Sequence, residues 1–315
     1  MTRVLVSCVQ MQRELPKFEG EFAARGIELV VPEVQQQLSE AELLQIMPDI
    51  DGVIVGDDKF TAAVLEASPR LQILSKWGIG LDCIDQEAAA RLGITVTNTP
   101  GVFADDVANV ATCYILMLAR ALHRVDAAVR AGTWLKVEGE SLRGKVLGVV
   151  GLGSIGRATA ERGRALGMAV VGSDPADPAR AAAEAGGVRT APLEEVLAAA
   201  DYLVLSCPLT PETHHLIDAG ALSAMKPGAK LINVARGPIV DEPALVEALR
   251  GARLAGAALD VFEVEPLPAN SPLRELPQVI LGAHNGSNAK EAVERTSRLA
   301  VENLLANLGS VRDPL

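Results

Sequence analysis

The chain has 315 residues, of which 49% are hydrophobic, 22% charged and only 3% aromatic, and its formal net charge at pH 7 is -11. This length exceeds the size at which a single hydrophobic core usually stops growing, so we expect two domains with mainly aliphatic cores. The acidic balance, with no run rich in Lys or Arg, disfavours nucleic acid and anionic membranes as partners.

The amino-terminal residues run directly into a short apolar strand, without the basic region and long apolar stretch of a secretion signal. No apolar run in the sequence approaches membrane-spanning length. The four cysteines are scattered, without the spacing of a disulfide framework or a zinc site. We therefore expect a cytoplasmic protein with reduced thiols and no bound metal.

Short β-type runs alternate with helical patterns along almost the whole chain, which is typical of parallel α/β sheets. The first strands are expected at residues 4–6, 29–31, 53–55, 73–74 and 95–97. A long helix is expected to follow at about residues 105–131, where apolar residues recur at helical spacing. Asp105 or Asp106 is expected to cap the start of this helix.

A second series of strands is expected at residues 145–150, 169–173, 202–206, 230–234, 254–259 and 279–281. The tail from residue 288 to residue 308 returns to helical spacing, and we expect it to pack back on the first domain. The sequence therefore predicts two parallel-sheet α/β domains that face each other across a cleft.

A glycine-rich turn follows the expected strand at residues 146–150 and opens a helix. The turn reads Gly151-Leu152-Gly153-Ser154-Ile155-Gly156. Gly151 would permit the tight turn, Gly153 would let the backbone approach a pyrophosphate, and Gly156 would let helix and strand pack closely. The phosphates would lie against the N–H groups at the helix start. A lone GxGxxG is weak evidence, because glycines also occur in turns for backbone reasons alone.

An acidic residue supplies a second test of this motif. Asp174 follows the next expected strand, about 20 residues after the glycines, where a carboxylate would accept hydrogen bonds from the adenosine ribose. Taken alone, Asp174 would be a turn residue before Pro175. Together with the glycines it predicts a dinucleotide site, and its negative charge favours NAD over NADP.

Three polar residues in the second half each follow an expected strand, where side chains can project from the carboxyl edge of a parallel sheet. Arg236 can hold a carboxylate through two N–H bonds, His284 can exchange a hydroxyl proton during hydride transfer, and Glu265 can orient the imidazole. Each residue alone has a simpler interpretation, as a surface charge, a structural histidine or a loop residue. Together they offer the chemistry that oxidation of a 2-hydroxy acid requires.

The chain resembles the D-isomer-specific 2-hydroxyacid dehydrogenases, closest to the D-3-phosphoglycerate dehydrogenase branch. The resemblance lies in the motifs KWGIGLD at 76–82, NTPG at 98–101, GLGSIG at 151–156, PLTPET at 208–213 and the runs 233–241 and 257–262. It implies a Rossmann NAD-binding domain, residues 101–286, inserted into a flavodoxin-like substrate-binding domain, residues 1–100 and 287–315, both doubly wound. It also implies a homodimer that uses the long helix and the segment with Trp134 and Leu135.

The resemblance further implies roles for individual residues. Arg236 would bind the substrate carboxylate, His284 would act as acid/base, and Glu265 would orient His284. The backbone at Gly78 and Ile79 would meet the substrate carboxylate, whereas Lys76 and Trp77 would serve a second anionic group or merely cap a strand. The other cofactor-binding positions would be Ser154, Ile155, Cys207, Pro208, Val234, Ala235 and Gly286, together with Asp260 on the nicotinamide carboxamide.

Two features depart from the phosphoglycerate branch. The loop Gly56-Asp57-Asp58-Lys59 lacks the Arg that those enzymes place near here, and its two acids would oppose a substrate phosphate. The chain ends soon after its last expected helix, so we expect the regulatory domain of many phosphoglycerate enzymes to be absent. The predicted function is the NAD-dependent interconversion of a small D-2-hydroxy acid and its 2-oxo acid.

Other functions stay open at this point. An NAD-sensing, corepressor-like binding protein would keep the same Arg, Glu and His. Formate and phosphite dehydrogenases share the fold, although formate enzymes usually replace the acid at position 265, which is Glu here. His123, His214 and His215 are expected to be surface or packing residues.

Overall fold

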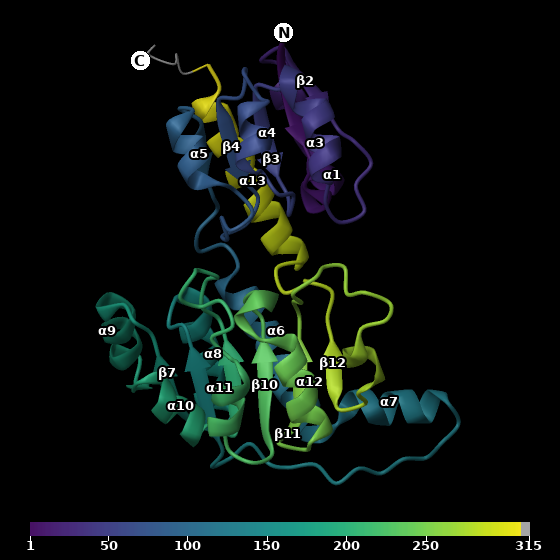
Figure 1. Ribbon diagram of the computed structural model, residues 1–315, viewed down its shortest axis with the longest axis vertical. Helices are drawn as coiled ribbons and strands as arrows, with labels where there is room; N and C mark the ends of the chain where they lie inside the picture. The colour runs from purple at the N-terminus through teal and green to yellow at the C-terminus, as the bar shows by residue number, and fades with distance from the viewer. Residues whose placement is uncertain (310–315) are drawn as a thin grey trace. The chain divides into compact units, whose positions relative to one another are not determined.

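The computed structural model describes residues 1–309 and divides into two compact units. Unit 1 is Met1–Val102 with the segment from Asn288, and unit 2 is Phe103–Ser287. Each unit holds one parallel sheet between helices (Figure 1). Residues 310–315, the end of the expected substrate-binding segment, lie outside the described residues. Up to residue 309, no helix is both long and apolar enough to cross a membrane.

Unit 1 is built on a five-stranded sheet in the order β2-β1-β3-β4-β5. Its strands are β1 (Thr2–Val6), β2 (Ile27–Val30), β3 (Gly52–Val55), β4 (Ile73–Lys76) and β5 (Thr95–Thr97). All pairings are parallel, which gives the flavodoxin-like doubly wound order. The central strands β3 and β4 are buried along their whole length, as expected for strands covered on both faces.

Helices cover both faces of this sheet. They are α1 (Val9–Glu14), η1 (Leu15–Lys17), α2 (Glu19–Ala23), α3 (Glu40–Ile46), η2 (Met47–Asp49), α4 (Ala62–Glu66), α5 (Gln86–Arg91) and α13 (Lys290–Asn307). On one face, α3, α4 and α5 bury Leu43, Val64 and Ala88 against the strands. On the other face α13 packs on β3 and β4, and the Ser75 hydroxyl donates to Ala300 O at 2.8 Å. The prediction that the tail helix packs on the first domain is confirmed.

Unit 2 is built on a seven-stranded parallel sheet in the order β12-β11-β10-β9-β6-β7-β8. Its strands are β6 (Val146–Val150), β7 (Ala169–Ser173), β8 (Arg189–Thr190), β9 (Tyr202–Leu205), β10 (Ala229–Asn233), β11 (Leu254–Leu259) and β12 (Val279–Leu281). This is the Rossmann order extended by one strand, and the winding direction reverses between β6 and β9. Ligands of such sheets bind at the carboxyl ends of the strands at this reversal. β8 was not predicted, because a strand of only two residues has no recognisable apolar pattern.

The helices of unit 2 again form two layers. They are α6 (Ala104–Arg120), α7 (Leu122–Arg130), α8 (Ser154–Ala165), α9 (Asp177–Ala185), α10 (Leu193–Ala199), α11 (Ala219–Ala224), η3 (Gly237–Ile239), α12 (Glu242–Arg250) and η4 (Pro272–Glu275). The helices α6 and α8 pack against each other and on one face of the sheet. On the other face, α10, α11 and α12 bury Val196, Leu222 and Leu245 in the main core of the unit.

The expected single helix at residues 105–131 is wrong, because the chain breaks it at Ala121. This residue has φ +50°, a left-handed conformation that ends α6 before α7 begins. The face of α6 that includes Val107, Ala111 and Tyr114 is buried, whereas α7 has no buried residue and projects from the unit (Figure 1). The predicted cap is also wrong: Phe103 precedes α6 without a side-chain cap, and Asp105 and Asp106 lie in the first turn.

Candidate active site

The glycine turn lies between the carboxyl end of β6 and the start of α8, and its three glycines have different surroundings. Gly151 has φ +90°, and a Cβ there would lie 2.5 Å from Cys207 N. A Cβ on Gly156 would lie 1.9 Å from Gly151 O. By contrast, no described heavy atom lies within 4 Å of a Cβ built on Gly153. Gly151 and Gly156 therefore allow the turn to pack, whereas Gly153 faces open space at the helix start, where a phosphate can approach.

Asp174 holds its carboxylate beside this turn. Its Oδ2 accepts a hydrogen bond from Leu152 N at 2.8 Å, and its Oδ1 accepts one from Ala176 N at 2.8 Å. The Arg180 guanidinium donates to the carbonyl oxygens of Asp174 and Pro175, both at 2.8 Å. These bonds fix the acidic residue at the end of β7, next to the strand that carries the glycines, as a ribose-binding carboxylate requires.

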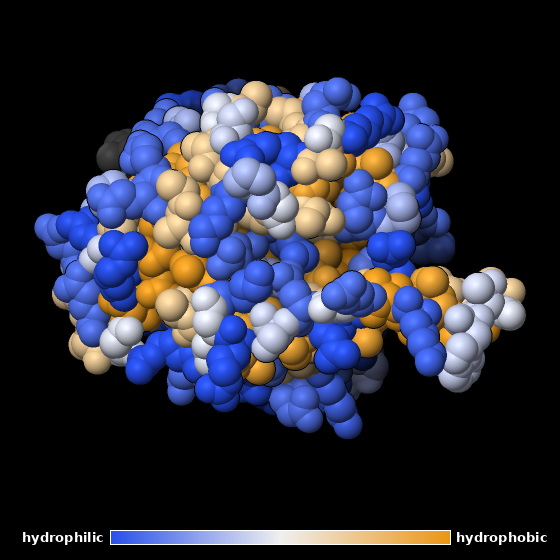
Figure 2. Space-filling view, turned by 90° about the horizontal axis from the view of Figure 1, so that it is seen from below, coloured by the Kyte–Doolittle hydropathy of each residue, from blue (hydrophilic) through white to orange (hydrophobic). Residues whose placement is uncertain are grey.

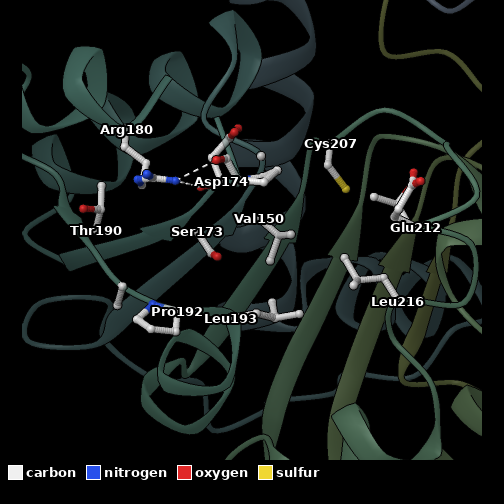
Figure 3. A pocket seen from close by; sticks show the side chains of 14 residues that line it. Val150, Ser173, Asp174, Arg180, Thr190, Pro192, Leu193, Cys207, Glu212 and Leu216 are labelled. Atoms are coloured by element: carbon white, nitrogen blue, oxygen red, sulfur yellow. Dashed lines mark hydrogen bonds between the residues drawn. The ribbon is translucent and has the colours of Figure 1, made fainter. Parts of the chain in front are cut away.

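A cavity of about 630 Å³ opens at this edge of the sheet (Figure 3). It is lined by Val150, Gly151, Ser173, Asp174, Pro175, Arg180, Thr190, Ala191, Pro192, Leu193, Cys207, Glu212, Thr213 and Leu216. Three of the predicted cofactor residues, Gly151, Asp174 and Cys207, are among them. Burial raises the pKa of the Cys207 thiol to about 11, and the Asp174 charge adds to this, so Cys207 stays a neutral lining group.

Glu265 and His284 are in direct contact. His284 Nδ1 lies 2.7 Å from Glu265 Oε2, and Glu265 Oε1 accepts a hydrogen bond from Phe262 N at 2.9 Å. The carboxylate is therefore fixed on both oxygens, and it in turn fixes the plane of the imidazole. His284 has φ +50°, a left-handed conformation that is uncommon for a residue with a side chain.

The buried Asp260 holds the turn that carries His284. The Asp260 carboxylate accepts hydrogen bonds from Tyr114 Oη at 3.0 Å, Asn285 N at 3.2 Å and Gly286 N at 2.8 Å. Burial and the neighbouring carboxylate raise the pKa of Tyr114, which therefore stays a hydrogen-bond donor. These contacts give Asp260 and Gly286 a structural role, and their predicted contacts with the cofactor stay predictions.

Arg236 follows β10, two strands away from β12, at the same carboxyl edge of the sheet. Its Nη1 donates to Ala235 O at 2.9 Å. The buried Asn233 shapes the turn, because its side chain accepts from Ala235 N at 3.0 Å and donates to Arg236 O at 2.8 Å. A Cβ on Gly237 would lie 1.8 Å from Phe262 C, so this turn packs directly on the segment that leads to Glu265.

The four predicted substrate-binding residues lie in unit 1, at the carboxyl end of β4. Lys76 is buried and donates to Gly56 O, and its Nζ lies 3.3 Å from Asp57 Oδ1. Trp77 is also buried, and its indole N–H donates to Ser297 Oγ at 3.0 Å. Gly78 N donates to Thr99 Oγ1 at 3.0 Å.

The backbone of Ile79 differs from that of Gly78. Asn98 Nδ2 donates to Ile79 O at 2.7 Å, whereas the Ile79 N–H has no partner among residues 1–309. This N–H is therefore available to a ligand or to water.

Several residues that hold the site in place could not be identified from the sequence. Ser206 Oγ donates to Gly151 O at 2.8 Å and so ties β9 to the glycine turn. Asn233 and Tyr114 hold the turns of Arg236 and His284, as described above. His215, expected to be a surface or packing residue, bonds to Glu263 at 2.8 Å. Each partner is distant in sequence from the residue it supports or lies inside a turn, so no local pattern indicated these contacts.

The fold and this site define a dinucleotide-binding oxidoreductase. The open space at Gly153, the start of the twelve-residue helix α8 and the Asp174 carboxylate fit the pyrophosphate and ribose of NAD. The site also presents a carboxylate-oriented imidazole and a guanidinium at the same sheet edge. A dehydrogenase needs such groups to exchange a proton with its substrate and to bind it.

Comparison with known proteins agrees with this class. The family profile "D-isomer specific 2-hydroxyacid dehydrogenase, NAD binding domain" matches residues 112–286. The chain is 40% identical over 283 residues to a protein named glyoxylate reductase from Thermofilum pendens, covering 88% of this chain and 84% of that one. The chain therefore belongs to the D-isomer-specific 2-hydroxyacid dehydrogenases, and NAD(H) is its cofactor.

Solved structures show the same similarity over the whole fold. A crystal structure of a protein from Thermus thermophilus is 39% identical, with a TM-score of 0.85 and 99% of each chain covered. An NADPH-dependent glyoxylate/hydroxypyruvate reductase from Sinorhizobium meliloti, solved with NADP and malonate, is 33% identical, with a TM-score of 0.83 and coverage of 98% and 94%. The family and the two parallel-sheet folds predicted from the sequence are confirmed.

Proposed function

We propose that this chain reduces a small 2-oxo acid, either glyoxylate to glycolate or a larger 2-oxo acid to its D-2-hydroxy acid, with His284, Glu265 and Arg236 as the groups that act on the substrate. The observation that carries the proposal is the 2.7 Å contact between His284 Nδ1 and Glu265 Oε2, at the sheet edge where Arg236 also lies. The residues of unit 1 at Gly78 and Ile79 are proposed to bind the substrate carboxylate through the backbone.

The bond to Glu265 assigns the two nitrogens of the His284 ring. Nδ1 is engaged by the carboxylate, so Nε2 is the nitrogen proposed to give a proton to the oxygen on C2 during reduction. In the oxidation direction the same nitrogen takes the hydroxyl proton. The NADH nicotinamide, when bound, supplies the hydride.

Arg236 is proposed to hold the substrate by its carboxylate. A guanidinium offers two parallel N–H donors to a carboxylate, and this fixes the orientation of the substrate as well as its position. The buried Asn233 holds the backbone of the Arg236 turn through two hydrogen bonds, so the guanidinium projects from a fixed turn.

The preference for NAD over NADP is proposed to come from Asp174. The Asp174 carboxylate is fixed by two backbone N–H groups, and its charge would repel a 2′-phosphate. Arg180, the cation nearest to it in the cavity lining, is engaged by two backbone carbonyls and by Asp177. The acid is therefore the group presented to the ribose.

The chain is proposed to act as a homodimer through α7 and the segment that follows it. Leu122, Val129 and Trp134 are 51%, 45% and 81% exposed, which is unusual for large apolar side chains on one projecting segment. Figure 2 shows apolar surface on the part that projects at the right, where α7 lies in Figure 1. A mass measured by light scattering during gel filtration tests this, and a monomer at micromolar concentration would contradict it.

The function is tested by following NADH oxidation with glyoxylate, hydroxypyruvate, pyruvate, longer 2-oxo acids and phosphohydroxypyruvate. We expect turnover with the small acids. His284→Ala should lower kcat by about 10²- to 10⁴-fold, because a positioned acid/base contributes that much. Arg236→Ala should nearly abolish turnover, and both variants should bind NADH like the parent.

Matched controls come from the same unit. His214→Ala in the loop before α11 and Arg250→Ala at the end of α12 remove the same residue types from exposed positions and should leave kcat unchanged. Full activity in either site variant would remove the role given to that residue. NADH binding without turnover on any 2-oxo acid would favour a binding protein instead.

A further inference from the structure

A second histidine-carboxylate pair connects the segments that carry Arg236 and Glu265. His215 Nε2 lies 2.8 Å from Glu263 Oε1. Glu263 precedes Glu265 by two residues, and His215 lies in the loop between β9 and α11. Neither residue has a part in the proposed chemistry.

The backbone of His215 is fixed to the segment that begins at Arg236. His215 N donates to Pro238 O at 2.8 Å, and Ile217 N donates to Ile239 O at 3.0 Å. The ladder continues where Asp241 N donates to Ile217 O at 3.2 Å. Three backbone bonds thus hold the His215 loop along the chain that leaves the arginine.

The side chain of His215 reaches the segment that carries Glu265. Its partner Glu263 is held by a reciprocal pair of bonds, because Glu263 N donates to Glu242 Oε1 at 2.6 Å and Glu242 N donates to Glu263 Oε1 at 3.3 Å. Glu263 Oε1 therefore receives both the Glu242 N–H and the His215 imidazole. Two residues further on, Glu265 contacts His284.

This arrangement gathers three carboxylates close to one another. Burial raises the pKa of Glu242, and the neighbouring Glu263 and Glu265 charges add to this. An imidazole donor on Glu263 offsets this repulsion, because it satisfies the carboxylate oxygen that faces Glu242. His214, whose ring stacks on His215 at a centroid distance of 4.1 Å, is exposed and lies outside the network.

Resting on the proposed function, we propose that His215 is a positioning residue. Its backbone holds the Arg236 segment, its Nε2 holds Glu263, and together they set the placement of the Glu265–His284 pair relative to Arg236. Loss of the Nε2 contact lets the segment from Phe262 to Glu265 shift while the NAD-binding residues around Gly153 and Asp174 stay in place. The effect is on kcat and not on coenzyme binding.

Three substitutions at one position separate this role from a backbone role. His215 has φ +51°, a left-handed conformation that Asn tolerates better than Gln or Ala. A Gln side chain places an amide nitrogen near the position of Nε2, whereas Asn places its amide near Nδ1 and falls short of Glu263. If only the backbone mattered, His215→Asn would be the mildest change. If the Nε2 contact matters, His215→Gln is the mildest.

We expect His215→Ala and His215→Asn to lower kcat with glyoxylate by about 10- to 100-fold, the cost of misplacing catalytic groups by about an ångström. His215→Gln should recover most of this loss. In all three variants the dissociation constant for NADH, measured by fluorescence titration, should equal that of the parent. His214→Gln is the matched control and should have the parent kcat.

The outcomes separate this inference from the proposed function. Parental kcat in His215→Ala, or a higher kcat in His215→Asn than in His215→Gln, overturns the positioning role while the function stands. A weakened NADH affinity in step with kcat also overturns it, because it would indicate a general structural role. Should His215→Ala unfold, the comparison of Gln with Asn still decides the question. No activity in the parent protein would overturn the proposed function itself.

Discussion

The glycine turn allows folding and coenzyme binding to be separated by two alanine substitutions. In Gly156→Ala the new Cβ would lie 1.9 Å from Gly151 O and 2.8 Å from Ser206 Oγ. A carbon and an oxygen in ordinary contact are more than 3 Å apart, so the start of α8 must move by more than an ångström from the turn. Overpacking of this kind costs about 1–3 kcal/mol.

For a domain of this size, each kcal/mol shifts the unfolding midpoint by roughly 2–4 °C, so Gly156→Ala should lower Tm by about 2–12 °C. It should also weaken NADH binding, because the first-turn N–H groups of α8 move with the helix. Gly153→Ala is the matched control: its Cβ meets no described atom within 4 Å, and its φ of -63° suits any residue. It should keep the parent Tm and still weaken NADH, since its methyl group occupies the space through which the phosphates approach.

Thermal unfolding without coenzyme and fluorescence titration with NADH measure the two effects independently. The reasoning is refuted if Gly156→Ala unfolds at the parent temperature, because the close contact with Gly151 O would then be relieved at no cost. Parental NADH affinity in Gly153→Ala would show that the coenzyme does not approach the backbone at this glycine.

Three further predictions concern single carboxylates. Asp174→Ala should raise the NADPH-to-NADH ratio of kcat/KM by about tenfold or more, because a like charge facing a phosphate costs at least about 1.4 kcal/mol; an unchanged ratio would remove the role of Asp174. The pKa of Glu140 is lowered from 4.5 to about 2. Burial raises this pKa, but hydrogen bonds from Lys145, Lys230 and Tyr202 lower it by more. A depressed pKa stabilises the fold above pH 4.5 and is lost as pH falls toward 2, so the Tm deficit of Glu140→Gln should shrink below pH 4.5, and a deficit independent of pH would contradict this. Glu138→Gln, exposed in the same loop, should leave Tm unchanged. Asp57→Asn removes the carboxylate that lies 3.3 Å from the buried Lys76 ammonium. The ratio of oxaloacetate turnover to glyoxylate turnover should therefore rise, because oxaloacetate has a second carboxylate for Lys76 to bind. The same ratio in the variant and the parent would exclude Lys76 from substrate selection.

The elements that sequence reasoning found are those with a local pattern. Short apolar runs marked eleven of the twelve strands, and the missed strand β8 has only two residues. Gly151–Gly156 and Asp174 were identifiable because a strand, a turn and a helix follow one another there with fixed spacing. The structure adds that Gly151 and Gly156 serve packing, whereas Gly153 leaves the open space.

Contacts between distant residues could not be predicted. Tyr114 and Asp260 are 146 residues apart and meet only because α6 packs on the sheet. The break between α6 and α7 at the left-handed Ala121 could not be predicted, because no glycine or proline lies beside this residue. Asp57 and Asp58 were expected to act alike, but Asp58 is fully buried against Ser7 Oγ at 2.5 Å and Leu38 N at 2.6 Å. Asp57 is the acid of this pair that forms the ion pair with Lys76.

A crystal structure with NAD and oxalate, an unreactive two-carbon analogue of glyoxylate, tests most directly whether Arg236 and His284 act on one substrate. We predict that the Arg236 guanidinium donates to one oxalate carboxylate, and that His284 Nε2 lies within about 3 Å of an oxygen on the carbon facing the nicotinamide. Oxalate bound out of reach of either side chain, with the coenzyme in place, would contradict the proposed chemistry.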